Sequence, residues 1–419
     1  MAAQIKLKAM TMQISPILAA LRYHKAGVVL IAMQIALTLA IVCNAMFIIH
    51  QRLVRMDKPS GVEESGLLVV KNEWAGKPAT GQIASLMAAD LDTLRKMPGV
   101  ANVYATNTYP LSNGGFANGI GHSPDKRNYV SVTAVYFSDE NTLSTLGLKL
   151  VEGRNFNADE INGLGDNDKI APAVIIVTRE LARRLYPDGS ALGKTAYISN
   201  EPSIIIGIVD RLQIPWVDNS MARWADCSTL LPFRNLVTIT HYLIRTQPEE
   251  IEDVATRVRA TLYATQRLRV IRPKDGVKTF AQVRAAAYKS DRGMAILMGV
   301  ISVILVATTA AGIVGLASFW VGQRRKQIGV RRALGATRQD ILGYFLTENL
   351  LICMAGVVLG GLLAIGLNLW LMKQFEMERI APGYVLAGVA MLLLLGQCAV
   401  FAPAWRASHV PPVEATRSV

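Results

Sequence analysis

The chain has 419 residues, of which 51% are hydrophobic and 18% charged, and its formal net charge is +13. The mean hydropathy of +0.30 is high for a soluble protein, and the apolar residues gather in four blocks. This distribution excludes a wholly soluble chain and predicts a membrane protein with a large soluble domain. The positive charge does not indicate nucleic-acid binding, because much of it flanks the apolar blocks and no basic stretch is interleaved with aromatic residues in the soluble part.

The first predicted span covers residues 26–49. It is long enough, because a helix needs about 20 apolar residues to cross a bilayer. The preceding segment 1–25 is basic, which favours a cytoplasmic N-terminus. A cleaved signal peptide is the alternative, but the apolar region is longer than such a peptide needs, and no clear cleavage site of small residues follows it.

Three more apolar blocks are predicted to span the membrane, at residues 292–322, 341–372 and 383–402. The segment 323–340 between the second and third spans is short and strongly basic, which favours the cytoplasmic side. With the C-terminal tail 403–419 on the same side, the large segment 50–291 is expected on the opposite, extracytoplasmic face.

Two strand–helix–strand patterns occur in the extracytoplasmic segment. The first has strands at 67–70 and 100–106 around a helix at 83–97, and the second has strands at 237–245 and 267–271 around a helix at 248–265. These assignments rest on hydrophobic periodicity. The region between the patterns, about 138–234, is rich in Gly, Asn and Asp with short β-like runs, which predicts an inserted α+β subdomain. The predicted fold is four transmembrane α-helices with a large α+β extracytoplasmic domain between the first and second.

The basic segment 323–340 carries the strongest candidate for a functional site. Arg324, Arg331 and Arg338 recur every seven residues, which on one continuous helix would place them on one face. The run 333–336 (Ala-Leu-Gly-Ala) adds small and apolar surface, so the segment could insert into a groove of a partner protein. The alternative is that the charges serve only topology and lipid headgroups. The charges alone favour neither.

Further features lie at the third span. Thr337 to Asp340 fits a capping box that would begin the span. Glu348, about two turns further on, is an ionisable residue within a span and therefore a candidate functional residue. The alternative is a glutamate near the interface that is solvated or paired with the basic segment. Gly356 and Gly360 form a GxxxG motif, which permits close helix packing within the subunit or at a dimer seam.

Several of these stretches resemble one known family. The run 327–337 (Gln-Ile-Gly-Val-Arg-Arg-Ala-Leu-Gly-Ala-Thr) resembles the cytoplasmic coupling segment of MacB/FtsX-type permeases, which belong to ABC systems. Residues 146–156, which include Gly153-Arg154, are similar to an element of the MacB-type periplasmic core domain. The bland alternative for that pair is a turn after a strand, with Arg154 on an internal carboxylate. The tail 403–415 resembles the family's C-terminal ending, although Thr416 stands where the family usually has Leu.

The resemblance implies a permease subunit of the inner membrane that couples ATP hydrolysis by a separate ATPase to extracytoplasmic movement and to export. The cargo would be a peptide, an antibiotic or a lipid-linked molecule. The residues that match the family's docking motif, and would contact the ATPase, are Arg331, Arg332, Ala333, Leu334, Gly335 and Ala336. Residues 50–56 and 279–289 are expected to continue the first two spans as a helical stalk.

The implied partners are the ABC ATPase subunit, a second permease chain that is identical or paralogous, a periplasmic adaptor with an outer-membrane channel, and membrane lipid. No GxxxxGK[ST] loop occurs, so ATP is expected on the partner, and no cofactor, metal or catalytic residue is expected on this chain. The alternative function is an FtsX-like scaffold that activates an extracytoplasmic cell-wall hydrolase and moves no cargo.

Overall fold

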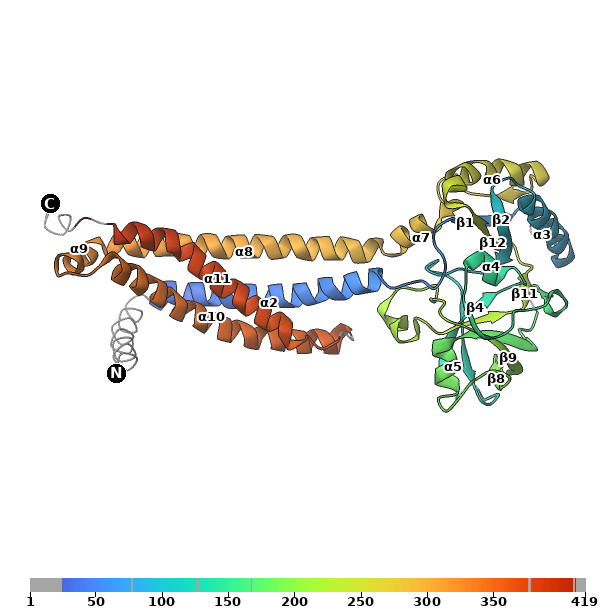
Figure 1. Ribbon diagram of the computed structural model, residues 1–419, viewed down its shortest axis with the longest axis horizontal. Helices are drawn as coiled ribbons and strands as arrows, with labels where there is room; N and C mark the ends of the chain where they lie inside the picture. The colour runs from blue at the N-terminus through green and yellow to red at the C-terminus, as the bar shows by residue number, and fades with distance from the viewer. Residues whose placement is uncertain are drawn as a thin grey trace. The chain divides into compact units, whose positions relative to one another are not determined.

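The computed structural model describes residues 25–76, 78–125, 128–166, 168–375, 378–409 and 411. These residues form two compact units, one made of residues 57–290 and the other of the chain on either side (Figure 1). Apart from Lys25, the expected N-terminal segment 1–25 lies outside the described residues, as does nearly all of the chain beyond His409.

The helical unit is built from four long helices. They are α2 (Lys25–Met56), α8 (Lys289–Gln323), α10 (Arg338–Phe375) and α11 (Pro382–Ser408). Among the described residues these four are long and apolar enough to cross a membrane, and each contains the whole of one predicted span. Between α8 and α10 lies a short helix, α9 (Arg325–Ala333).

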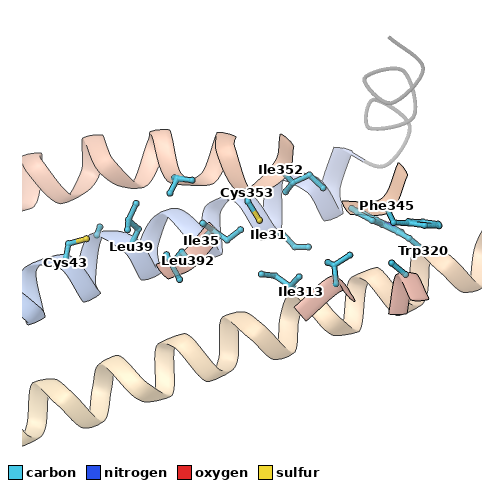
Figure 2. Close-up of a cluster of buried hydrophobic side chains, with 14 of the residues drawn as sticks. Ile31, Ile35, Leu39, Cys43, Ile313, Trp320, Phe345, Ile352, Cys353 and Leu392 are labelled. Carbon is cyan, nitrogen blue, oxygen red and sulfur yellow. The ribbon is translucent and has the colours of Figure 1, made fainter. Parts of the chain in front are cut away.

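Helices α2, α10 and α11 pack closely, because glycines let their backbones approach. A Cβ atom added to Gly356 would lie 2.9 Å from the Ala32 carbonyl oxygen of α2, and one added to Gly360 would lie 2.8 Å from the Cα of Ala36. The GxxxG motif therefore packs within the subunit, against α2. Around it lies an apolar core to which all four long helices contribute, and in which Leu39 is fully buried (Figure 2).

Helix α8 is packed much less tightly than its neighbours. Within their most apolar windows, 11% of the residues of α8 are buried, against 44% for α2 and 33% for α10. Several of its contacts with α2 are polar. The hydroxyls of Thr38 and Thr309 lie 2.8 Å apart, and Arg52 pairs with the carboxylate of Asp291.

The unit of residues 57–290, which we call the extracytoplasmic unit after its expected location, contains a five-stranded antiparallel sheet. Its strands are β13 (Arg269–Val270), β1 (Leu67–Trp74), β12 (Ile239–Thr246) and β2 (Val100–Thr106) in that order, with β14 (Val277–Thr279) also on β1. Helices α3 (Thr80–Arg95) and α6 (Ile251–Thr265) bury their apolar stripes in its core, and the 3₁₀ turn Pro248–Glu250 precedes α6. Both strand–helix–strand patterns therefore contribute to one sheet.

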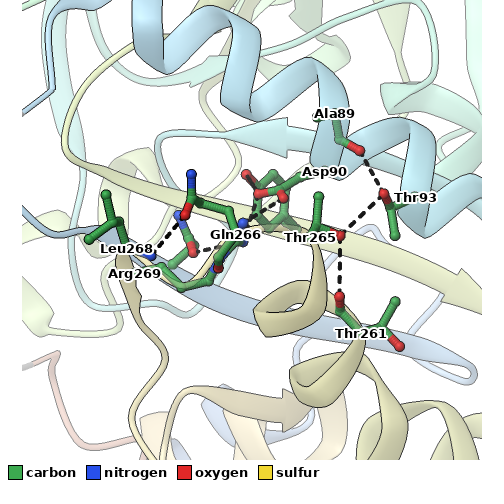
Figure 3. A network of polar contacts seen from close by, with 10 residues as sticks. Ala89, Asp90, Thr93, Thr261, Thr265, Gln266, Leu268 and Arg269 are labelled. Atoms are coloured by element: carbon green, nitrogen blue, oxygen red, sulfur yellow. Dashed lines mark hydrogen bonds and ion pairs between the residues drawn. The ribbon is translucent and has the colours of Figure 1, made fainter.

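A buried ion pair joins the two patterns in this sheet (Figure 3). Both side chains, Asp90 of α3 and Arg269 of β13, are fully buried, and two hydrogen bonds of 2.7 Å connect them. The hydroxyl of Tyr242 donates to the same carboxylate at 2.7 Å, and the guanidinium lies 4.6 Å from the ring centre of Trp74. Because these groups satisfy one another, the charges are tolerated inside the core.

The chain between the two patterns forms a second sheet of seven strands that closes on itself. Its order is β5 (Leu150–Gly153), β9 (Glu201–Val209), β7 (Val174–Thr178), β10 (Ser228–Leu231), β4 (Ser131–Phe137), β3 (Phe116–Gly121) and β8 (Thr195–Ile198). Strand β8 also pairs with the first half of β9, which closes the barrel. Helix α5 (Arg179–Leu185) buries Leu181 and Leu185 against the barrel core.

Smaller elements complete this unit. They are α4 (Thr142–Leu146), the 3₁₀ turns Ala158–Glu160 and Asn219–Trp224, and the strand pair β6 (Asn162–Leu164) and β11 (Phe233–Asn235). Gly153, the last residue of β5, has a left-handed φ of 78°, and Arg154 pairs with Glu160 through bonds of 2.6 and 2.8 Å. This agrees with the interpretation of Gly153-Arg154 as a turn whose arginine meets an internal carboxylate.

The second expected stalk helix is interrupted, so the prediction of one helix through residues 279–289 is wrong. Helix α7 (Phe280–Ala287) begins at a capping box of Thr279 and Gln282. It ends before Tyr288, and α8 starts at the following residue, Lys289. Tyr288 is 4% exposed, and its hydroxyl accepts a hydrogen bond from the Gln213 side chain. The break therefore falls at a residue that is buried within the unit of residues 57–290. The first expected stalk segment, by contrast, continues α2 without interruption to Met56.

Candidate functional site

The basic segment folds as helix α9 followed by a tight turn. Gly335 has a left-handed φ of 98°, and its N–H donates to the carbonyl of Arg332. The next N–H, that of Ala336, donates to the carbonyl of Arg331 at 3.0 Å. This pair of bonds is a Schellman motif, in which glycine takes the position that side chains disfavour. The sequence Arg-Arg-Ala-Leu-Gly-Ala therefore ends a helix.

A capping box then starts the third long helix at once, as the sequence predicts. The N–H of Thr337 donates to the Asp340 carboxylate at 2.9 Å, and the N–H of Asp340 donates back to the threonine hydroxyl at 3.2 Å. Arg338 is the first residue of α10, whereas Arg331 lies on α9 and Arg324 precedes α9. The prediction of one face shared by all three arginines is wrong, since it assumed a continuous helix.

The first arginine of the segment is turned inward. Nη1 of Arg324 lies 2.9 Å from both carboxylate oxygens of Glu348 on α10. The two side chains are 11% and 3% exposed. Of the two interpretations of Glu348, the structure agrees with the one in which it pairs with the basic segment.

Two further arginines of α9 also face the long helices. The guanidinium of Arg331 lies 4.8 Å from the ring centre of Tyr344, one turn before Glu348 on α10. Nη1 of Arg332 donates to the backbone carbonyl of Ser408 at the end of α11, at 2.7 Å. Sequence reasoning missed Tyr344 and Ser408. The first had a usable signal, because residues four apart share a helix face.

The outward side of α9 is apolar at its end. Leu334 is 83% exposed and Val330 is 49% exposed, with Ala333 and Gly335 exposed between and beside them. We call these four residues the apolar tip. Of the six predicted docking residues, three belong to the tip, while Arg331 and Arg332 contact the long helices and Ala336 packs against their core.

The extracytoplasmic unit holds a separate polar pocket of about 320 Å³ on the barrel. It is lined by residues of the β3–β4 region and the β8–β9 hairpin, among them Asn118, Tyr129 and Ser199. Within the described part of the chain no cluster of three or more His, Cys, Asp or Glu side chains is arranged to hold a metal. The candidate functional site is therefore helix α9 with its apolar tip.

Comparison with known proteins identifies the family. A model of the FtsX-like permease C-terminal matches residues 299–412, and a model of the MacB-like periplasmic core domain matches residues 31–263, more than half of the chain. The chain belongs to the MacB/FtsX-type permeases of ABC transporters. The FtsX-like match includes α9, α10, α11 and most of α8.

Curated relatives of this permease carry the same family name. The macrolide export ATP-binding/permease protein MacB of Agrobacterium fabrum is 26% identical over 354 residues, covering 81% of this chain and 50% of that protein. The protein of the same name from Chromobacterium violaceum is 27% identical over 280 residues, covering 64% and 41%. The chain spans about half the length of the curated relatives it matches.

Among solved structures, the periplasmic region of MacB from Actinobacillus actinomycetemcomitans aligns at 14% identity with a TM-score of 0.34. That alignment covers 56% of this chain and 97% of that one.

Proposed function

We propose that this permease couples ATP hydrolysis by a separate ABC ATPase to movement of its extracytoplasmic domain and to export of a cargo. The observation that carries the proposal is the apolar tip of α9, in which Leu334 is 83% exposed between two long apolar helices. A helix end of this kind, beside exposed cations such as Arg325 and Lys326, suits insertion into a groove of a partner protein.

The charge pattern supports a cytoplasmic position for α9, where an ATPase would meet it. Short loops rich in Lys and Arg stay on the cytoplasmic side. Both termini would then be cytoplasmic as well, and residues 57–290 would form the extracytoplasmic domain. Such a chain would lie in the inner membrane with α2, α8, α10 and α11 as its spans.

In this proposal two permease chains, identical or paralogous, act with two ATPase chains. Closure of the ATPase dimer on ATP displaces α9, and the spans carry the displacement to the extracytoplasmic domain. The five-stranded sheet with α3 and α6 serves as a porter-like part, and the barrel as its inserted subdomain. ATP is held by the partner, so this chain needs no cofactor of its own.

The cargo is handled outside the membrane and passed to a periplasmic adaptor with an outer-membrane channel. Macrolides are the first cargo class to test, because the curated relatives are named for macrolide export. The hydrolase-activating scaffold has no specific observation in its favour among the described residues, so export is the function proposed.

The test is co-purification of the full chain with the ABC ATPase encoded beside it, in lipid nanodiscs. Leu334→Asp and Val330→Asp place a charge in the apolar tip and touch none of the arginine contacts. We expect either change to weaken ATPase binding by roughly a hundredfold, which is the effect of losing an interface anchor. Arg332→Glu is a poorer probe, because it also removes the bond to Ser408.

Leu192→Asp is the matched control, since Leu192 is 39% exposed and lies in the extracytoplasmic unit. It should bind the ATPase as the wild type does. If the wild-type chain binds no ATPase, or if both tip variants bind as well as wild type, the docking role of α9 is refuted.

A further inference from the structure

The position of α9 depends on a small set of contacts. The helix that precedes it, α8, has only 11% of its apolar window buried and gives little support from that side. Among the described residues, α9 and the Arg324 that precedes it are held to the other long helices by Ile328 in the apolar core and by the contacts of Arg324, Arg331 and Arg332.

One of these contacts differs from the rest because it is enclosed. Arg324 lies at the junction of α8 and α9, and its partner Glu348 is 3% exposed. The Arg331 side chain is exposed, and Arg332, which is half-buried like Arg324, donates to an uncharged backbone carbonyl, so neither forms an enclosed pair of opposite charges. An ion pair removed from water is held by mutual attraction and hydrogen bonds, and losing either partner leaves an uncompensated charge.

The glutamate also sits where all four long helices meet. A crevice of about 20 Å³ beside it is lined by Ile31 of α2, Trp320 of α8, Val400 of α11 and Asn349 of α10. The Asn349 side chain donates to the Gly396 carbonyl of α11 at 3.0 Å. A displacement of Glu348 would therefore be felt by all four long helices. A displacement of a side chain on the outer surface of one helix would not.

We propose that the Arg324–Glu348 ion pair is the joint that positions α9 on the helical bundle and through which a displacement of α9 reaches the spans. This inference rests on the proposed docking of α9 to an ATPase. Docking would use the outward apolar tip, and transmission would use this inward pair, so the two can be lost separately. Arg324 and Glu348 act here as positioning residues, with no contact to nucleotide or cargo.

The first test separates assembly from transmission in the nanodisc complex. Arg324→Gln and Glu348→Gln should leave ATPase binding close to wild type and lower the permease-dependent ATP hydrolysis by roughly tenfold, a usual size for coupling between sites. The charge exchange Arg324→Glu with Glu348→Arg should recover part of the loss. Arg338→Gln, the same change at an exposed arginine of α10, is the matched control and should behave as wild type.

The second test needs no ATPase and therefore remains valid if the docking proposal fails. Nitroxide labels at Gln327→Cys on α9 and Leu363→Cys on α10, in a Cys398→Ser background, report the distance between the helices by pulsed electron paramagnetic resonance. The distance distribution should broaden in Arg324→Gln and in Glu348→Gln, and remain narrow in Arg338→Gln.

Two results would overturn the inference. One is an unchanged distance distribution in both single variants, because the pair would then not position α9. The other is a broadened distribution with undiminished hydrolysis in the assembled complex, because transmission would then follow another route. A wild-type chain that binds no ATPase would refute the docking proposal and leave the distance measurement to decide the positioning role.

Discussion

At the scale of single residues, the turn after α9 depends on one glycine. Gly335 has a φ of 98°, and a Cβ added there would meet no atom within 4 Å. A substitution would therefore be strained by its backbone conformation and not by a clash. A left-handed conformation costs a residue with a side chain about 1 kcal/mol or more. Because no neighbouring atom is displaced, this cost lowers the stability of the α9 C-terminus only.

We expect Gly335→Ala to destabilise the α9 C-terminus by about 1 kcal/mol. Backbone amides of α9 should exchange with deuterium about fivefold faster, while amides of α10 beyond the capping box exchange as in wild type. Gly343→Ala is the control, because Gly343 lies within a helix and also meets no neighbouring atom. Equal exchange rates in α9 of both variants would contradict the role given to Gly335.

At the residue scale, the sequence predicted best the contacts between residues that are close together in the chain. The capping box from Thr337 to Asp340 was predictable because both of its hydrogen bonds join residues three positions apart. The contacts of Arg331 and Arg332 were not predictable, because Tyr344 and Ser408 belong to other helices. A run of arginines indicates a cationic segment but does not say which face of it meets the protein.

At the scale of elements, the packing of α10 on α2 rests on its glycines. Gly360 lies so close to α2 that a side chain there would force the backbones apart. Gly366, further along the same helix, has no atom within 4 Å of an added Cβ. The two positions therefore offer a matched comparison in one helix.

We predict that Gly360→Leu lowers the stability of the helical unit by roughly 3 kcal/mol, the upper end of the cost of overpacking a close-packed site. Gly366→Leu should change it by less than about 0.5 kcal/mol, as surface substitutions do. Thermal unfolding of the purified protein in one detergent, followed by the accessibility of Cys353, which is 1% exposed, would measure both. Similar midpoints for the two variants would show that α10 does not depend on close contact with α2.

The long helices were predictable as elements because each predicted span is a mostly apolar run at least as long as a membrane crossing requires. Strands β1, β2 and β12 were located nearly as well, since they alternate or are continuously apolar. Strands β3 and β4 were not predicted, and the expected subdomain boundary at residue 138 is wrong, because both strands belong to the barrel. Their partners were not predictable. Closure of the barrel requires β9 to pair with β8 and β5 on one edge and β7 on the other, and no periodicity within β9 encodes that.

At the scale of the whole molecule, two titratable groups near the meeting of the two sheets give opposite responses to pH. Burial raises the pKa of Asp139, which follows β4 of the barrel, to about 6. Burial and the charge of Lys71 lower the pKa of His241, on β12 of the open sheet, to about 4. Asn107 connects the sheets here, since its side chain accepts the Phe137 N–H and its carbonyl lies 3.1 Å from the histidine ring.

The signs follow from which state binds more protons. Between about pH 4 and 6 the folded protein holds a proton on Asp139 that the unfolded chain loses, so this group makes the free energy of unfolding fall as pH rises. Between about pH 4 and 6.5 the unfolded chain binds a proton on His241 that the folded protein does not bind. This group therefore makes the free energy of unfolding rise as pH rises. Because a tenfold change in proton affinity corresponds to about 1.4 kcal/mol, each contribution is roughly 3 kcal/mol, and the two nearly cancel.

Replacing one of these two groups should therefore reveal the pH dependence of stability that the other produces. Relative to wild type, His241→Gln should lose roughly 3 kcal/mol of stability as the pH rises from about 4 to 6.5, and Asp139→Asn should gain a similar amount. Hydrogen exchange of the β12 amides in the full chain, corrected for the intrinsic pH dependence of exchange, measures both. Glu249→Gln, at an exposed acid, serves as the control, and wild-type slopes in both test variants would disprove the balance.

The pairing of β1 also dictates an order of events when the chain first folds. Its neighbours in the sheet are β12, β13 and β14, and the first of these begins at Ile239, far along the chain from Leu67. Loop closure over so long a separation is slow, and until it occurs the apolar strand has no partner. The barrel residues between them can complete their own sheet earlier, because β3 to β10 end at Leu231. Newly made chains therefore pass through an interval in which β1 is exposed, and a holding chaperone on the extracytoplasmic side would act on that strand.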